Sequence, residues 1–457
     1  MTFAQNQTWT LEDCVKRAIE ENISIKQSEL DYANAELDKL GAFASFFPSV
    51  SANANHSWNI GLNQNITTGL LENVTTQFSS MSVGMGVDIY NGLQNINRLH
   101  RANLSLLARQ YQLADIADNV SLLVANAYLQ VMFNREILGV QKAQLEVSKE
   151  ELERTQQLIQ AGALTRRDIF EIEANIATQE QALIQAENAY RLTKINLAQL
   201  LMITDYENFE IANEDFEVPL SQILNETPKD IFEKSLTLRN DIKLSVTNLE
   251  IAEKDVELSK GALQPSIGAF YSYSTRISYS DRIRGTGEFS EIPIGYVAGT
   301  GQVVNTQIEG REVIGPLPIA DQLGLNDGHN FGIQLSIPIF NGFSLKNNVK
   351  RNKINVERAK NQLEQQKLDL ESTINQAYND ALGAFTFFEA AQKTVRARKD
   401  AYDNAQDSYA AGVTNAFEYA QIKQRYESAV SDEVRAKFDY IFKLKVLEFY
   451  FGVKLEI

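Results

Sequence analysis

Two long stretches without proline constrain this chain more than any other feature. The first runs from Asn91 to Gly162 and the second from Asn341 to Gly412, and each begins with Asn-Gly and ends with Ala-Gly. Leu, Ala, Gln, Glu and Val dominate the first, a composition that favours helix. About 70 residues of helix span roughly 105 Å, well beyond the length of an ordinary globular helix. The sequence therefore predicts two long helical rods.

Composition and charge exclude several classes of protein. The 457 residues carry 59 acidic and 43 basic side chains, so a nucleic-acid partner is not expected, because phosphate binding needs a basic surface. The single cysteine, Cys14, cannot form an internal disulfide and is interpreted as a helix-face residue. His56, His100 and His329 are far apart in sequence, so we expect neither a metal site nor a cofactor.

The sequence gives no sign of a membrane-spanning helix or of an intact secretory leader. It contains no run of 18 apolar residues. The first five residues are consistent with the remnant of a removed signal peptide behind an initiator methionine. A membrane β-barrel stays possible, because its alternating strands leave no hydropathy peak.

A helix is predicted over residues 9–47. Thr10 and Asp13 form a T-x-x-D capping box at its start, apolar residues follow at helical spacing, and Pro48 ends it.

Two stretches with a period of two follow this helix. The apolar face of the first stretch comprises Val50, Ala52, Ala54, His56 and Trp58, and its other face holds only Ser and Asn. A second alternating stretch covers residues 81–89, where Met, Val and Ile face one side and Ser, Gly and Asp the other. Both are predicted strands, and the polar segment 61–77 between them is predicted to be a loop.

The second half of the chain repeats the first. A helix is predicted over 166–202, and a polar connector follows over 203–229. The pattern of the first half then recurs as a helix over 230–262 and two strands, one from 266 and one over 330–339. The offset between the halves is 217 at Pro48-Ser49-Val50 and Pro265-Ser266-Ile267, and 250 from Tyr90-Asn91-Gly92 onward. The second half therefore carries a 33-residue insertion within 276–328, predicted to be a long loop that can carry short structure of its own. Internal duplication is the strongest architectural signal in the sequence.

This pattern divides the chain into six segments. They are a first short helix (1–48), a first strand pair (49–90), a first long helix with its turn and return helix (91–202), a connector with the second short helix (203–264), a second strand pair with the long loop (265–340), and a second long helix with its turn and return helix (341–457).

Four alternating strands point to a shared barrel. Strands of about ten residues can cross a bilayer when tilted, and each has one apolar face and one small or polar face. Four strands cannot close around a polar lumen, and an open sheet edge cannot lie in lipid. The strands of several chains must therefore share one barrel in the lipid, and the polar rods must continue outside the membrane.

The order of these elements resembles the TolC-like outer-membrane efflux family. The resemblance covers about Trp9 to Gly452 and rests on the duplication, on Asp88-Ile89-Tyr90-Asn91-Gly92 with Pro338-Ile339-Phe340-Asn341-Gly342, and on Tyr409-Ala410-Ala411-Gly412. It implies an α+β membrane protein, a homotrimer with a twelve-strand β-barrel, four strands per chain, continued by a coiled-coil-like α-helical barrel through the periplasm. It also implies a periplasmic adaptor and an inner-membrane transporter as partners.

The two turns that end the rods are the first candidate site. Both fit G-x-x-[T/N]-x-x-[D/E], with Gly162, Thr165 and Asp168 in one turn and Gly412, Asn415 and Glu418 in the other. Locally, the glycines should end the incoming helices in the left-handed region, and Thr165 and Asn415 should open capping boxes. The resemblance adds that such turns form the far tip of the tunnel, where the adaptor docks and the closed end is latched.

Asp168 and Tyr409 match family positions whose hydrogen bonds hold the tip shut. The competing interpretation is a half-buried tyrosine that packs against its own hairpin. The family position that carries a basic residue of this network is occupied by Thr414 here. Arg166 or Arg167 would have to supply that charge instead.

Glu418 and Gln421 match family positions where acidic residues of several chains can form two rings at the narrowest point of the tunnel. Only Glu418 is acidic here, so the field that favours cations should be weaker. The competing interpretation is a solvated capping glutamate.

The sequence thus predicts a passive outer-membrane duct that conducts substrates delivered by an inner-membrane pump, since no G-x-x-x-x-G-K-[ST] nucleotide-binding motif occurs. A soluble helical scaffold would explain the rods but not the four strands. An enzyme is not expected, because no catalytic residue set stands out.

Overall fold

The computed structural model describes residues 8–64, 69–162, 165–212 and 222–452. The five residues interpreted as a leader remnant therefore lie outside the described chain. Two compact units are present, and each takes segments from both repeats. The first contains Met1–Lys39, Arg101–Glu253 and Lys353–Ile457, and the second contains Leu40–His100 and Lys254–Asn352.

The predicted N-terminal helix is two helices, α1 (Leu11–Glu21) and α2 (Ile23–Ala44). The capping box is confirmed, because the Thr10 side chain accepts from the Asp13 amide and the Asp13 carboxylate accepts from the Thr10 amide. The prediction of one continuous helix is wrong at Asn22, which is extended (φ −62°, ψ 130°). Its side chain accepts from the amide of the next helix's second residue at 2.9 Å, a favourable N-cap.

The second repeat contains the same interruption. Its predicted helix is α5 (Pro228–Leu238) and α6 (Asn240–Gly261), separated by the extended Arg239 (φ −68°, ψ 134°). A second capping box opens α5 at Thr227 and Asp230. Thr227 and Arg239 each lie 217 residues after their counterparts, so the duplication includes a break that apolar periodicity did not reveal.

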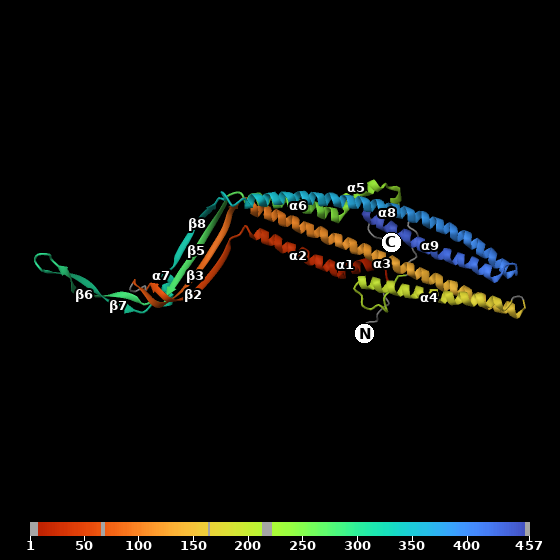
Figure 1. Cartoon of the computed structure of the whole chain (residues 1–457), viewed down its shortest axis with the longest axis horizontal. Coiled ribbons are helices and arrows are strands. Elements are labelled where there is room, and N and C mark those ends of the chain that lie inside the picture. The colour runs from red at the N-terminus through yellow and green to blue at the C-terminus, as the bar shows by residue number, and fades with distance from the viewer. Residues whose placement is uncertain (1–7, 65–68, 163–164, 213–221, 453–457) are drawn as a thin grey trace. The chain divides into compact units, whose positions relative to one another are not determined.

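The two rods are confirmed as α3 (Gln94–Gln160) and α8 (Ser344–Ala410), each 67 residues long. Their return helices are α4 (Arg167–Leu200) and α9 (Ala416–Phe451). Within the first unit, the α3–α4 turn and the α8–α9 turn lie at the same end (Figure 1).

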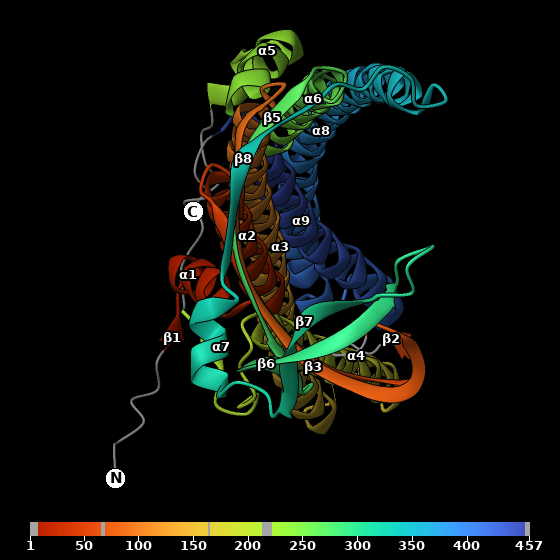
Figure 2. The same ribbon diagram turned by 90° about the vertical axis from the view of Figure 1, so that its left-hand side faces the viewer.

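The second unit is built on one antiparallel sheet in the order β2-β3-β5-β8 (Figures 1 and 2). The strands are β2 (Ser49–Gln64), β3 (Leu71–Asn91), β5 (Ser266–Ser278) and β8 (Gly328–Ser336). Each predicted strand is therefore present. Among the described residues, β2 and β8 each pair along one side only, so they are the edges of this sheet.

The predicted loop over 61–77 is largely strand. Leu62 pairs with Asn73 and Gln64 with Leu71, and residues 65–68 lie outside the described chain. The prediction failed because Asn, Gly and Thr in this segment are typical of turns, whereas here they continue a long two-stranded ladder.

The two faces of the sheet differ in chemistry, as the alternation predicted. Apolar side chains form one cross-strand row, which consists of Val50, Met85, Tyr271 and Phe331. The adjacent row on the other face is small and polar, and it consists of Ser51, Gly84, Ser272 and Asn330. All four apolar residues are exposed in the single chain.

The insertion in the second half is mostly a hairpin rather than a loop. Strands β6 (Arg282–Tyr296) and β7 (Val303–Ile314) pair antiparallel, and helix α7 (Ile319–Leu325) follows. The Gln322 side chain accepts from the Ser278 amide at 2.8 Å and donates to the Ser278 carbonyl at 3.0 Å. The Gln322 side chain thereby provides hydrogen-bond partners for the backbone of β5 beyond Ser274, where the pairing with β8 ends.

The first unit contains two cores, one centred on each repeat, and α9 of the second repeat adds Phe438 and Ile441 to the first core. Tyr128 is fully buried in the first, and its hydroxyl donates to the Trp9 carbonyl at 3.3 Å. Tyr378 packs against the second core, and its hydroxyl donates to the Leu224 carbonyl at 3.2 Å. Cys14 is buried in the first core, which agrees with its interpretation as a helix-face residue.

Short elements before α1 and in the connector support these tyrosines. Trp9 belongs to β1 (Thr8–Trp9), which pairs in parallel with β4 (Glu210–Ile211). Leu224 belongs to a 3₁₀ turn, η1 (Gln222–Asn225).

Helix α3 differs from the expectation in one respect. Within Gln94–Gln157 it is long and apolar enough, by length and composition, to cross a membrane. The same helix supplies the core residues Val124, Tyr128 and Val131. These three side chains are therefore used in packing against other helices.

Candidate functional site at the ends of the helical hairpins

The two predicted turn glycines adopt the left-handed conformation. Gly162 has φ +76° and Gly412 has φ +72°. In the second turn, the Gly412 amide donates to the Tyr409 carbonyl and the Val413 amide to the Ser408 carbonyl at 2.9 Å, the bond pattern of a Schellman C-cap. The local interpretation of both glycines is confirmed.

The starts of the return helices differ from each other. Asn415 caps α9, as predicted, by accepting from the Glu418 amide at 2.8 Å. The prediction that Thr165 caps α4 is wrong, because the N-cap is Arg166 and the helix begins one residue later than predicted. The Arg166 side chain makes no cap hydrogen bond. The side chain of Asp168 lies outside the described part of the structure.

Four tyrosines form a ladder between α8 and α9 just above the second turn. The Tyr409 and Tyr419 rings stack with centroids 4.9 Å apart and planes 5° apart. Tyr419 also stacks on Tyr402 at 5.9 Å, and Tyr402 stacks on Tyr426 at 5.2 Å. Such ring pairs add to the apolar burial that holds the two helices of this hairpin together.

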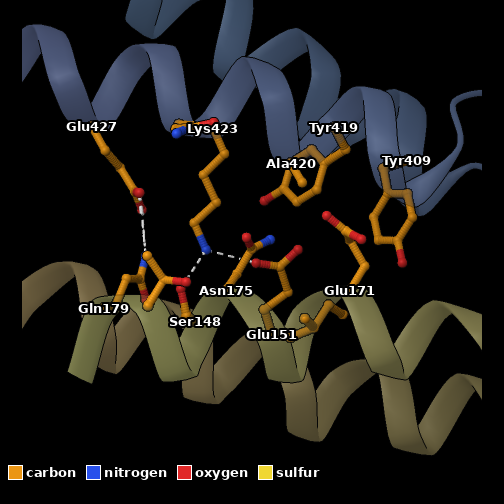
Figure 3. Close-up of a pocket in the computed structure, with 13 residues that line it drawn as sticks. Ser148, Glu151, Glu171, Asn175, Gln179, Tyr409, Tyr419, Ala420, Lys423 and Glu427 are labelled. Carbon is orange, nitrogen blue, oxygen red and sulfur yellow. Dashed lines mark hydrogen bonds and ion pairs between the residues drawn. The ribbon is translucent and has the colours of Figure 1, made fainter. Parts of the chain in front are cut away.

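A buried lysine joins this hairpin to the other one. The Lys423 ammonium on α9 donates to the Glu151 carboxylate at 2.7 Å and to the Ser148 hydroxyl at 2.8 Å, both on α3 (Figure 3). Lys423 is only 7% exposed. A charge this deep needs its partners, because an unpaired buried ammonium is strongly unfavourable.

Glu427 makes a second link between the hairpins, one helical turn from Lys423. The Gln179 amide on α4 donates to both carboxylate oxygens of Glu427 at 3.2 Å (Figure 3). Burial raises the pKa of Glu427 and the nearby Glu151 charge adds to this effect, whereas Lys423 and Gln179 lower it. The result is a carboxyl whose ionised form is less favoured than in water.

These polar side chains surround a cavity of about 100 Å³ between α3, α4, α8 and α9. Tyr409 and Tyr419 line one part of it together with Glu171, and Lys423, Glu151 and Glu427 are among the residues that line the rest (Figure 3). The arrangement suits a polar clamp between two helical hairpins. Among the described residues, no group of three His, Cys, Asp or Glu side chains is placed to hold a metal ion.

Only part of the predicted site meets at this cavity. Tyr409 lines it, whereas Glu418 and Gln421 are exposed outside it, and the Thr414 amide closes the turn by donating to the Ser408 carbonyl at 3.3 Å. Thr165 is exposed at the first turn.

Sequence reasoning missed the central residue, Lys423. Its partner Glu151 lies 272 residues away, so no local motif joins them. One signal was present, because Lys423 lies one turn after Tyr419 and one turn before Tyr426 and Glu427, on the buried face of α9. A lysine at such a position predicts a distant acidic partner.

Comparison with known proteins places these features in a family. A family model described as outer membrane efflux protein matches residues 14–201 and 231–452. The alkaline protease secretion protein AprF of Pseudomonas aeruginosa is 21% identical over 332 residues, which cover 72% of this chain and 60% of AprF. The pyoverdine export outer membrane protein OpmQ of the same organism is 26% identical over 197 residues, which cover 43% of this chain and 40% of OpmQ. The chain thus spans less than two thirds of the length of both relatives.

Solved structures agree in fold. The crystal structure of the outer membrane protein VceC from Vibrio cholerae has a TM-score of 0.75 at 14% identity, covering 98% of this chain and 97% of VceC. At this identity the likeness shows the fold alone. Because the family model matches most of both repeats, this chain belongs to the outer membrane efflux protein family, whose members reside in the outer membrane.

Proposed function

We propose that three copies of this chain form a passive exit duct through the outer membrane. Each copy contributes four strands to a twelve-strand barrel, and the helices continue the duct into the periplasm. A periplasmic adaptor and an inner-membrane transporter deliver the substrate, and the transporter supplies the energy and selects the cargo.

The observation that carries this proposal is the sheet of the second unit. Its apolar face exposes side chains such as Met85, Tyr271 and Phe331, and its opposite face carries small and polar ones. Lipid on one side and water on the other would satisfy both faces. The edges at β2 and β8 require further strands, because open edges are not tolerated in lipid. A soluble scaffold leaves both features without a purpose.

In this proposal, the two hairpin turns form the periplasmic tip. Gly162 and Gly412 shape the turns, Asn415 fixes the start of α9, and the tip is where the adaptor docks. The same proposal makes the hairpin β6–β7 and α7 extracellular.

A gate at this tip would use Asp168 and Tyr409 as a latch between helices. Hydrogen bonds of this type contribute about 0.5–3 kcal/mol each, so they can be exchanged on opening. Thr165 and Thr414 lie in the same turns, and an arginine such as Arg166 would replace the missing basic partner. The Glu418 carboxylates of three copies would form one acidic ring, with Gln421 making the second ring neutral.

The mass of the particle tests the duct. We expect light scattering of detergent-extracted protein to give three chains per particle, with aggregation in plain buffer. A monodisperse particle of one or two chains in buffer alone would contradict the shared barrel.

Conductance in planar bilayers tests the latch separately. Tyr409→Phe combined with Asp168→Asn should raise the conductance, because the first change removes the tyrosine hydroxyl and the second removes the carboxylate charge that would accept from it. The exposed Lys229→Met on α5, outside both turns, serves as a control with an expected small effect. Conductance equal to that of the wild type in the double variant would eliminate the latch and leave the duct in place.

A further inference from the structure

A second cavity lies on the polar face of the sheet, at the end where β2 begins and β3 ends. It measures about 610 Å³, and all of its lining residues belong to the second compact unit. They come from the end of α2, the start of α3 and all four strands of the sheet. Pockets that hold small molecules measure roughly 300–1,000 Å³, so the size is that of a small-molecule site.

Glycines form part of the floor of this cavity. Gly86 and Gly268 lie inside strands, where a glycine often marks a place that a ligand approaches closely. Neither has a positive φ, so the backbone does not require glycine at these positions. A Cβ added at Gly86 would meet no atom of the described chain within 4 Å, and one at Gly268 would meet only the Val87 carbonyl oxygen at 3.6 Å. The space that larger side chains would fill is therefore open.

Phe270 lies beside this floor and interrupts a row of small residues on the polar face. The row consists of Ser49, Gly86, Phe270 and Gly332. A Cβ added at Gly332 would lie 3.2 Å from two carbons of the Phe270 ring, so the ring covers Gly332 and leaves Gly86 open. The Phe270 side chain lines the cavity and stays 39% exposed. It therefore offers an aromatic surface to the cavity.

Phe78, on the same face of the sheet, shows what such a ring attracts. The Arg276 guanidinium lies over the Phe78 ring, 4.4 Å from its centroid. In the part of the chain that the structure describes, no cation lies over Phe270. A group from outside the chain can therefore stack on the Phe270 ring.

Two side chains of opposite charge line the same cavity. Asp88 belongs to β3, in the row next to that of Phe270, and Arg98 belongs to the start of α3. Both are exposed, and within the described chain their side chains bond to the neutral amides of Asn91 and Asn95 rather than to each other. The buried Asn95 accepts from Arg98 at 3.0 Å and donates to the Ser45 carbonyl at 3.0 Å, which fixes the support of the guanidinium.

The duplication does not account for these residues. A position that serves the fold in both repeats recurs, as Gly92 and Gly342 do, both with positive φ. The counterparts of Phe270, Asp88 and Arg98 are instead Asn53, Pro338 and Asn348. The combination of one ring and two opposite charges therefore occurs once per chain.

We propose that this cavity binds small zwitterions that carry an aromatic ring, as a contact site for solutes inside the duct. The ring stacks on Phe270, the cationic group contacts Asp88 and the anionic group contacts Arg98. The inference rests on the proposed function only in that the polar face lines the lumen. Binding is weak because both charges are exposed to water, and weak binding lets a solute leave again.

The two charges favour a zwitterion over a singly charged molecule of the same size. A cation is attracted by Asp88 and repelled by Arg98, and an anion experiences the reverse. A neutral aromatic molecule uses Phe270 alone. A molecule with both charges gains from both side chains at once.

Three indole compounds of different charge test the assignment by blocking the ionic current of the protein in planar bilayers. Tryptophan is a zwitterion, tryptamine a cation and indole-3-propionate an anion. Tryptophan should reach half-block at a concentration about two- to fivefold lower than either of the others, the size of effect that one exposed ion pair gives.

Variants of the lining residues identify the contacts. Asp88→Asn should make tryptophan block no better than indole-3-propionate, and Arg98→Gln should make it block no better than tryptamine. Phe270→Leu keeps an apolar side chain and should weaken all three several-fold. Equal block by the three compounds in the wild type, or an unchanged order in both charge variants, would overturn the assignment of a zwitterion.

A filled floor tests the cavity itself. Gly86→Val adds a side chain where a Cβ meets open space, and should abolish the block. Gly84→Val is the matched control, because Gly84 lies two residues away on the same face, outside the cavity, and its Cβ would meet Ser51 at an ordinary 3.8 Å. Block that is equally strong in these two variants would show that tryptophan acts elsewhere in the lumen and would overturn the site.

A binding measurement separates this inference from the duct. Saturation-transfer NMR with the detergent-extracted full chain should detect tryptophan bound to the wild type and to Gly84→Val, and not to Gly86→Val. Tryptophan that binds in this way to a particle that conducts no current would overturn the duct and keep the site. A conducting wild type with neither block nor a saturation-transfer signal would overturn the site and keep the duct.

Discussion

Removal of the Lys423 charge probes the clamp between the two helical hairpins most directly. Lys423→Met keeps the apolar stem of the side chain and deletes the ammonium that contacts Glu151 and Ser148. The Glu151 carboxylate, with its side chain 15% exposed, would then be left without its cation and close to Glu427. We expect a clear loss of stability from this uncompensated charge.

The size of the loss follows from the environment. Removal of one partner of a buried ion pair costs about 3–5 kcal/mol. The adjacent cavity of about 100 Å³ has room for water, which would solvate part of the stranded carboxylate. We therefore expect a value near the lower end, about 3 kcal/mol. Lys423→Met combined with Glu151→Leu removes both charges and should return to within about 1 kcal/mol of the wild type.

Chemical unfolding in detergent micelles, followed by helical circular dichroism, measures these differences. Lys229→Met is the matched control, because Lys229 and Glu233 form an exposed pair at 3.9 Å whose loss should cost less than about 0.5 kcal/mol. A Lys423→Met variant as stable as this control, or a double variant no more stable than the single one, would refute a buried ion pair as the basis of the clamp.

Three further predictions concern the same helices and their junction with the sheet. The raised pKa of Glu427 means that its contribution to stability is fully present below its ordinary pKa of 4.5 and is lost as pH rises through the raised value. Glu427→Gln should therefore gain stability relative to the wild type as pH rises through that range, and match it below; a difference independent of pH would contradict this. Gly92→Ala should destabilise by more than about 1 kcal/mol, because its φ is +68° and a Cβ would lie 2.1 Å from the Gly261 carbonyl oxygen. Gly139→Ala within α3 should instead stabilise by about 0.5–1 kcal/mol, because a Cβ there would meet open space. Thermal unfolding of both variants checks the contrast. Ala401→Lys places a cation at the counterpart of Glu151, which the proposed trimer would bring opposite Glu173 of a second copy, the counterpart of Lys423. This variant should lower bilayer conductance relative to Ala401→Met, and equal conductance would rule out that contact.

The sequence was most informative where a periodic pattern ran for many residues. The ends of α3 and α8 lie within three residues of the predicted glycine-bounded rods, because glycine and helix formers act locally. Alternation of apolar and polar residues located all four strands of the sheet, because this pattern too is local. Composition misled at 61–77, since polar strand residues outside the apolar band resemble a loop.

The insertion and the clamp were harder to predict, because both depend on contacts between distant segments. The pairing of β6 with β7 joins residues such as Arg284 and Glu312, which no single periodic stretch contains. The turn geometry at Gly162, Gly412 and Asn415 was accessible from sequence, since it depends on neighbouring residues. Lys423 and Glu151 come together only once α9 packs on α3, so their pairing required the tertiary structure.

The position of the clamp within the duplication bears on how a shared duct would open. Lys423 and Glu151 belong to different repeats of the same chain, so their ion pair joins its two hairpins. Their counterparts are Glu173 and Ala401, both exposed, and these two side chains cannot form an ion pair. If three copies surround one pore, the hairpins of each chain would be tied by charge and the equivalent contact between chains would not. Near this ion pair, the contact between copies would then be weaker than the contact between the two hairpins of one chain. We therefore expect opening to separate neighbouring chains while the two hairpins of each chain move together. The conductance of the Ala401→Lys variant decides this, because a new charge pair across that boundary should oppose opening.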